Sequence, residues 1–230
     1  MLPLPQVHPV SIPIHNDSQR FPVRRVYCVG RNYADHAIEM GDTGREPPFF
    51  FLKPSDALFP VPAGQTTDWP YPMATDDCHH EVELVVALAC GGKNLTPRDA
   101  AACIWGYALG LDMTRRDRQA EMKKAGKPWE IGKAFDQGAP IGPLVPVGDR
   151  GLLTAGAISL SVNGASRQAG NLSQLIWPLA EMMAELSKAW SLEAGDLIYT
   201  GTPAGVGPVK RGDLVEAQFD GLPALSIRVV

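Results

Sequence analysis

Residues Glu81–Ala89 read EVELVVALA, and this stretch reveals more of the architecture than any other part of the chain. It alternates polar and apolar residues at its start and then becomes uniformly apolar, as a strand does when it runs from a site into a core. The stretch Gly106–Asp112, GYALGLD, is a second buried strand, and it ends on a carboxylate. We therefore expect a sheet whose buried strands carry acidic side chains at one end.

Shorter elements surround these two strands in the sequence. The other expected strands are 25–30, 49–52, 159–162, 197–200, 214–219 and 225–229. Asn163-Gly164 favours a type I′ hairpin turn, which needs two positive φ values. The expected helices are 32–40, 97–104, 173–190, and 115–125 with Thr114 as its N-cap. Because strands outnumber helices and no regular βαβ alternation occurs, the pattern predicts an α+β fold in one domain, residues 25–230, behind an extended proline-rich leader, residues 1–24.

Composition and charge exclude several classes of partner. The net charge is −4 and no basic run is longer than two residues, so we expect no nucleic acid partner and favour a small molecule. No apolar run follows a basic start, so we expect no signal peptide and no membrane span, and a cytoplasmic location. The cysteines, Cys28, Cys78, Cys90 and Cys103, form no CxxC pair and are interpreted as reduced core residues.

The acidic residues near the ends of the two buried strands form the first candidate site. Glu81 and Glu83 are at alternate positions of a strand, so both carboxylates leave the same face. Two such charges repel unless a cation or a proton lies between them. With Asp112 they offer three hard oxygen ligands, a set that suits Mg²⁺ or Mn²⁺, with Ca²⁺ as an alternative, and disfavours zinc. The other interpretation is the solvent face of an edge strand, and residue types alone leave both open.

A second candidate lies in residues 32–39, NYADHAIE. On a helix His36 and Glu39 share a face, so the carboxylate can orient the imidazole and raise its basicity. This arrangement suits a general base that takes a proton from water. The alternative is a surface ion pair of little energetic value. Residues 37–48 are expected to form a mobile lid.

Cationic residues follow Asp112 closely. Arg116 and Lys133 would lie near the carboxylates and could hold an anionic keto acid, since arginine makes bidentate contacts to carboxylates. The alternative is a solvated helix face, which is our interpretation of Arg118, Lys123 and Lys124. Residues 199–207, YTGTPAGVG, are expected to form a tight turn that presents N–H groups and hydroxyls to a ligand, because the dinucleotide glycine pattern is not matched.

These segments together resemble the fumarylacetoacetate hydrolase family from about Arg25 to the C-terminus. The similar motifs are CVGRNYADHAIEMG, PPFFFLKPSDAL, HHEVELVVALA, GYALGLDMTRRDRQ, KPWEIGKAFD, the Asn-Gly hairpin and GDLIYTGTPAGVGPVKRGD. The resemblance implies a mixed β-roll or β-barrel-like core with a few flanking helices, like the C-terminal domain of fumarylacetoacetase. It also implies a single catalytic domain over residues 25–230, usually within a homodimer.

The resemblance assigns roles to individual residues. The implied ligands of Mg²⁺ or Mn²⁺ are Glu81, Glu83 and Asp112, and the implied catalytic residues are His36, Glu39 and Lys133. The implied substrate contacts are Arg31, Tyr33, Arg116, Gln119 and Thr202. Longer members of the family carry a fourth carboxylate where this chain has Val29, so the site resembles that of the shorter members.

Among the shorter members, segments such as WPYP, PWEIGKAFD and QLIWPLAE are most similar to fumarylpyruvate hydrolases of aromatic degradation by the gentisate pathway. The implied reaction is metal-dependent cleavage of a C–C bond in a β-diketo acid, fumarylpyruvate giving fumarate and pyruvate. Acylpyruvases and oxaloacetate decarboxylases or tautomerases share the same site and remain alternatives. A non-enzymatic alternative is a ligand-binding β-domain that Ca²⁺ stabilises.

Overall fold

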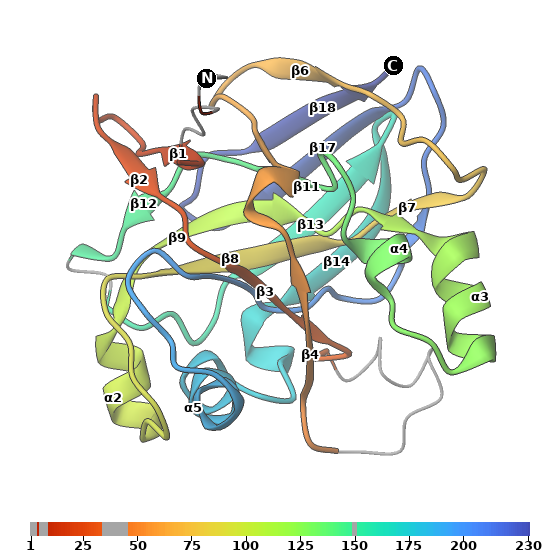
Figure 1. The fold of residues 1–230 in the computed structure, drawn as a ribbon. Helices are drawn as coiled ribbons and strands as arrows, with labels where there is room; N and C mark the ends of the chain where they lie inside the picture. Colours follow the sequence, from red (N-terminus) through yellow and green to blue (C-terminus); the bar gives the residue numbers. More distant parts are fainter. Residues whose placement is uncertain (1–3, 5–8, 34–45, 149–150) are drawn as a thin grey trace.

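The computed structural model describes residue 4 and residues 9–33, 46–148 and 151–230 (Figure 1). The expected helix 32–40, with His36 and Glu39, lies almost wholly outside the described residues, as does most of the expected lid, 37–48. No helix among the described residues is long and apolar enough to cross a membrane.

The largest sheet has eight strands and contains both strands singled out in the sequence. Its order is β4-β3-β15-β8-β9-β11-β5, with β12 also paired to β9. The bounds are β3 Val26–Gly30, β4 Phe49–Lys53, β5 Leu58–Pro60, β8 Val82–Leu88, β9 Ile104–Leu111, β11 Ala139–Ile141, β12 Val145–Pro146 and β15 Leu197–Tyr199. Strand β8 pairs antiparallel with both β9 and β15, so it lies inside the sheet.

Strand β8 is apolar after Glu83 because both of its faces are covered there. Leu84 and Val86 belong to a core cluster shared with the second sheet, whereas Val85 and Ala87 face a separate cluster. That separate cluster includes Ile12 from the hairpin of β1, Ser11–Pro13, and β2, Arg20–Pro22. The expected leader, residues 1–24, therefore contributes a two-stranded hairpin to the core.

The second sheet has the order β14-β13-β17-β18-β6 and packs over the first. Its strands are β6 Thr66–Trp69, β13 Ala157–Val162, β14 Ala165–Asn171, β17 Leu214–Phe219 and β18 Leu225–Val229. Asn163 and Gly164 join β13 to β14 with φ values of 53° and 75°, as the hairpin turn requires. A small third sheet, β10-β7-β16, comprises Thr114–Arg115, Cys78–His80 and Gly207–Pro208.

The described helices are few: α2 Pro97–Ala102, α3 Arg116–Ala125, α4 Glu130–Lys133 and α5 Leu179–Ala189, with short 3-10 turns at Ser55–Ala57 and Leu172–Gln174. Figure 1 shows α2 beside α5 on one side of the molecule and α3 with α4 on the other. Mixed sheets with few helices confirm the prediction of an α+β fold.

Three local predictions were wrong. The expected helix 173–190 is shorter, because Pro178 occupies the N-cap of α5 in an extended conformation and the helix begins at Leu179. Thr114 does not cap α3, because the Thr114 hydroxyl accepts a hydrogen bond from Lys133. The N-cap of α3 is Arg115, which makes no side-chain capping hydrogen bond. Cys90 is exposed rather than in the core, while Cys28, Cys78 and Cys103 are buried.

Candidate active site

Three carboxylates converge where β8 begins and β9 ends. Glu83 lies in β8 opposite Gly110, Glu81 lies just before β8, and Asp112 follows β9. The backbone N–H of Asp112 donates to the carbonyl of Glu81 at 2.8 Å, which brings the two chain segments together. One carboxylate oxygen from each residue lies within 4.8 Å of the other two, and all three residues are buried. Their burial excludes the alternative of a solvent-facing edge strand.

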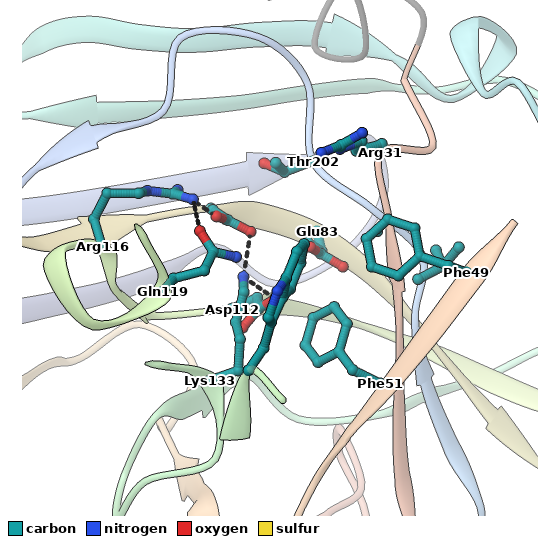
Figure 2. A pocket seen from close by; sticks show the side chains of 13 residues that line it. Arg31, Phe49, Phe51, Glu83, Asp112, Arg116, Gln119, Lys133 and Thr202 are labelled. Carbon is teal, nitrogen blue, oxygen red and sulfur yellow. Dashed lines mark hydrogen bonds and ion pairs between the residues drawn. The ribbon is translucent and has the colours of Figure 1, made fainter. Parts of the chain in front are cut away.

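Lysine side chains balance part of this negative charge. Lys133, at the end of α4, places its Nζ 2.8 Å from Glu81 Oε2 and 2.7 Å from Asp112 Oδ2 (Figure 2). Lys133 Nζ also donates to the hydroxyl of Thr114 at 2.7 Å. Lys53, at the end of β4, pairs with Asp112 Oδ1 at 2.9 Å. Both lysine side chains are as buried as the carboxylates they contact.

The pKa values of the site reflect burial and crowding of charge. Burial, followed by the charges of Asp112 and Glu81, raises the pKa of Glu83 well above its usual value. Burial opposes the charge of Lys133, but Asp112 and Glu81 outweigh it and raise the pKa of that ammonium, so Lys133 is a cation at neutral pH. Burial also lowers the pKa of His80, which precedes Glu81 in the chain.

The acidic cluster fits a hard divalent cation. Asp112 Oδ1 is buried and accepts no hydrogen bond within the described part of the chain, although Lys53 lies beside it. Within the described residues, Glu83 receives one hydrogen bond, from the N–H of Gly201 to its Oε2 at 2.7 Å. Three buried carboxylates with lone pairs left over provide the oxygen donors that Mg²⁺, Mn²⁺ or Ca²⁺ prefers. Glu81, Glu83 and Asp112 can therefore hold a metal ion.

A pocket opens over the acidic cluster. The lining residues are Val29, Gly30, Arg31, Phe49, Phe51, Glu81, Glu83, Asp112, Arg116, Gln119, Trp129, Lys133 and Thr202. Figure 2 shows Arg116, Gln119 and Thr202 around the carboxylates and Lys133, with the rings of Phe49 and Phe51 to one side. The structure thus brings together four of the five predicted substrate contacts in one pocket.

Tyr33 is the predicted substrate contact that does not line this pocket. Its side chain is 2% exposed and belongs to the main core cluster, and its backbone pairs with Leu175. Burial, followed by the charge of Glu83, raises the pKa of its phenol. His36 and Glu39 lie outside the described residues. The roles of these three residues stay predictions.

Arg116 organises one wall of the pocket. Its Nη2 donates to Glu81 Oε1 at 2.5 Å, and its Nη1 donates to Gln119 Oε1 at 2.6 Å. The guanidinium therefore orients the predicted metal ligand and the predicted substrate contact at the same time. Lys123 and Lys124, interpreted as part of a solvated helix face, are exposed on α3.

The turn after β15 serves the carboxylates more directly than expected. We expected residues 199–207 to present N–H groups to a ligand, but the N–H of Gly201 points to Glu83. Gly201 has a φ of 98°, and a Cβ there would lie 2.8 Å from Cβ of Asn32, so both the backbone conformation and the close contact require glycine. Thr202 then enters the pocket lining.

Several residues at the site were not identified in the sequence. Phe49, Phe51 and Trp129 line the pocket. Lys53 and Thr114 do not line it but contact Asp112 and Lys133, respectively. A signal for Lys53 existed, because it shares a strand parity with Phe49 and Phe51 and therefore leaves β4 on the same face. Trp129 comes from the loop before α4, where no sequence pattern indicated a site residue. Its ring centre lies 5.2 Å from that of Phe49 and 5.9 Å from Nζ of Lys123.

The chain belongs to the fumarylacetoacetate hydrolase family, because the model of the fumarylacetoacetate hydrolase C-terminal region matches residues 25–230. Among solved structures, it is similar to fumarylpyruvate hydrolase from Pseudomonas aeruginosa in complex with Mn²⁺ and pyruvate. That chain is 55% identical with a TM-score of 0.96, and the match covers 100% of this chain and 99% of that one. The predicted family and its fold are confirmed.

Two similar relatives are named for different activities. The fumarylpyruvate hydrolase of Ralstonia sp is 41% identical over 82% of this chain and 95% of its own length. The oxaloacetate tautomerase YcgM of Escherichia coli K12 is also 41% identical, over 91% of this chain and 94% of its own length. The family is therefore shown, whereas the substrate is not decided by identity alone.

Proposed function

We propose that this protein hydrolyses fumarylpyruvate to fumarate and pyruvate, with Mg²⁺ or Mn²⁺ held by Glu81, Glu83 and Asp112. The observation that carries the proposal is that these buried carboxylates line one pocket together with Lys133, Arg116 and Thr202. A pocket of this composition offers oxygen ligands for a metal and hydrogen-bond donors for an anionic keto acid. The similarity to the Pseudomonas aeruginosa enzyme, solved with Mn²⁺ and pyruvate, supports the same assignment.

The bound metal would polarise the keto oxygens of the substrate. Side chains of the protein would bind the substrate, stabilise developing charge and move the proton. The Arg116 guanidinium and the Gln119 and Thr202 side chains would bind the carboxylate and keto oxygens at the pyruvate end. The buried ammonium of Lys133 would stabilise negative charge that develops on the substrate oxygen after water attacks. In this proposal His36, oriented by Glu39, removes the proton from that water.

The pocket also offers contacts for the far end of fumarylpyruvate. The fumaroyl group is flat and conjugated, and the rings of Phe49, Phe51 and Trp129 line the same pocket. Arg31 lines it too, with its guanidinium carbon 5.9 Å from the ring centre of Phe49. We propose that Arg31 binds the distal carboxylate, which acetylpyruvate lacks.

A substrate panel with a matched variant tests the proposal. The full chain loaded with Mn²⁺ should hydrolyse fumarylpyruvate, seen as loss of its enol absorbance, and removal of the metal with EDTA should abolish the activity. Arg31→Gln should lower kcat/KM for fumarylpyruvate by about tenfold or more and leave acetylpyruvate nearly unchanged, because only the first substrate loses a charged contact. Failure of the Mn²⁺-loaded enzyme to cleave fumarylpyruvate would overturn the assignment.

A second candidate is tautomerisation or decarboxylation of oxaloacetate, favoured by the similarity to the Escherichia coli tautomerase. Oxaloacetate is also a dianionic keto acid, but it is shorter and has no conjugated acyl group to lie against the three rings. Assayed beside fumarylpyruvate under one metal condition, it should be the poorer substrate. We further propose that residues 25–230 act as one catalytic domain within a homodimer, as the family resemblance implies.

A further inference from the structure

The pocket hydroxyl of Thr202 is connected to a buried glutamine that does not line the pocket. Gln168 lies in β14, on the second sheet, and its side chain is fully buried. Its Nε2 lies 2.7 Å from Thr202 Oγ1 and 2.8 Å from the carbonyl oxygen of Pro203. Its Oε1 lies 3.1 Å from the backbone nitrogen of Val82 and 2.9 Å from Nδ1 of His80.

These contacts fix the orientation of the amide without ambiguity. A carbonyl oxygen can only accept, so the atom facing Pro203 must be the NH₂ group of Gln168. The backbone nitrogen of Val82 can only donate, so the atom facing it must be the amide oxygen. The two constraints agree, and all four hydrogen-bonding positions of the side chain are filled.

The orientation of Gln168 determines the polarity of its other two partners. Because the amide oxygen accepts, Nδ1 of His80 must carry a proton. Nε2 of His80 is buried and has no hydrogen-bond partner within the described residues, as expected for the tautomer protonated on Nδ1. Because the amide NH₂ donates, Oγ1 of Thr202 must accept from it. The single hydrogen of the Thr202 hydroxyl is then left for another acceptor, and the described part of the chain gives it none.

We infer that Gln168 is a positioning residue that forces Thr202 to act as a hydrogen-bond donor toward the pocket. This inference rests on the proposed function, since it assumes that an anionic keto acid occupies the pocket. A carboxylate or enolate oxygen can only accept, so a threonine whose hydrogen is not used inside the protein is matched to that ligand. Without the NH₂ group of Gln168, the Thr202 hydroxyl would no longer be held as an acceptor inside the protein, and its hydrogen would no longer be directed to the ligand.

The local backbone keeps the turn of Thr202 against β14. A Cβ at Gly205 would lie 2.0 Å from the carbonyl oxygen of Arg167, so the turn approaches β14 more closely than any side chain would allow. Gly205 also has a φ of 93°, which favours glycine. The register of turn and strand is therefore fixed by backbone contact, and Gln168 adds the direction of the hydrogen bond.

The test measures binding of oxalate, a stable dianion with adjacent oxygens, to the Mn²⁺-loaded full chain by isothermal titration calorimetry. Thr202→Val should weaken binding by about tenfold or more, and Thr202→Ser should retain the affinity. Gln168→Met should weaken binding to a similar degree although residue 168 lies outside the pocket. The double variant should bind no more weakly than Thr202→Val alone, because both changes remove the same donated hydrogen bond.

Two further variants separate positioning from loss of stability. Gln168→Glu keeps the size of the side chain and an acceptor for the N–H of Val82, but it presents Thr202 with an acceptor in place of the NH₂ donor. It should therefore also weaken the binding of oxalate. Ser187→Ala is the control for stability. It removes a buried hydroxyl of α5 that accepts from the N–H of Leu95 and donates to the carbonyl of Ala184, so it should lower stability without changing the affinity for oxalate.

Two results would overturn the inference: wild-type affinity in Gln168→Met, or a double variant whose loss equals the product of the single losses. Turnover of fumarylpyruvate is measured separately on the wild type. Absence of turnover with intact coupling of Gln168 and Thr202 contradicts the proposed function alone, whereas turnover without coupling contradicts this inference alone.

Discussion

Lys53 joins the end of β4 to three other parts of the chain, and its replacement should be unusually damaging for a single lysine. Its Nζ donates to the carbonyls of Met113 and Gly138, each at 3.0 Å, and to the carbonyl of Lys133, and it pairs with Asp112 at 2.9 Å. The side chain of Lys53 is 0% exposed. Lys53→Met keeps the length of the side chain but removes hydrogen bonds to three buried carbonyls, of which, in the described part of the chain, only that of Gly138 keeps another donor, the N–H of Met113. It also removes the positive charge beside the buried carboxylate of Asp112.

The magnitude follows from burial. At 2.9 Å and an effective dielectric constant near 20, the attraction between Lys53 and Asp112 is about 6 kcal/mol before desolvation is subtracted. Breaking a buried pair by removing one partner costs about 3–5 kcal/mol. For a chain of this size, that loss lowers Tm by roughly 6–20 °C.

Urea unfolding and thermal melting, both in EDTA, measure this loss without a contribution from bound metal. Lys124→Met is the matched control, because Lys124 is exposed on α3 and should change the free energy of unfolding by less than about 0.5 kcal/mol. If Lys53→Met unfolds at the same urea concentration as Lys124→Met, the reasoning that Lys53 is an essential buried cation is refuted.

Three further predictions concern other groups. Glu83→Gln should weaken Mn²⁺ binding strongly. Mn²⁺ at about 100 times the wild-type Kd stabilises the wild type by about 2.7 kcal/mol, but it should raise the Tm of the variant little. Equal affinities of both proteins for Mn²⁺, measured by calorimetry, would contradict the role of Glu83 as a ligand. Burial opposes ionisation of Asp117, but hydrogen bonds from Thr75 and two backbone N–H groups together outweigh it and lower the pKa of Asp117 below the ordinary 3.8. Because the folded pKa is the lower one, the stabilisation is fully present above the unfolded value of about 3.8 and is lost as pH falls from there through the folded pKa. Asp117→Asn should therefore flatten the acid side of a plot of unfolding free energy against pH, and an unchanged slope would count against it. Cys90 Sγ lies 2.9 Å from Cys103 Sγ, so diamide should accept one hydrogen from each thiol and leave a disulfide between them. Mass spectrometry should show the loss of two hydrogens, and the disulfide should stabilise the fold by about 3 kcal/mol for a loop of this length. Persistence of two free thiols would contradict this prediction.

Much of the fold follows from local patterns. The apolar run of β8 after Glu83 predicts a strand covered on both faces, and two clusters cover it. The Asn163-Gly164 turn follows from the backbone conformations these residues adopt without strain. The excessive length expected for α5 shows the limit of apolar periodicity, because Pro178 stops the helix whatever the stripe of apolar residues suggests.

The site was only partly predictable because two of its supports are isolated polar residues within strands. The carboxylates were visible as a spaced set at strand ends. Lys53 and Gln168 have no such pattern, and their partners lie on other sheets or elements far along the chain. Their roles arise only when the fold brings β4 to β9 and β14 to the turn after β15.

Thr114 shows why a correct local rule gave a wrong result at this site. A threonine before a helix predicts an N-cap, and such a cap contributes about 1 kcal/mol. Leaving a donor of the buried Lys133 ammonium without an acceptor costs more, about 1–3 kcal/mol and upward for a charged group. The hydroxyl therefore accepts from Lys133 and donates to Glu81, and α3 begins after Arg115 with no side-chain cap. At the start of α3, hydrogen bonding within the cluster of buried charges therefore overrides the local capping preference, as is expected near a functional site.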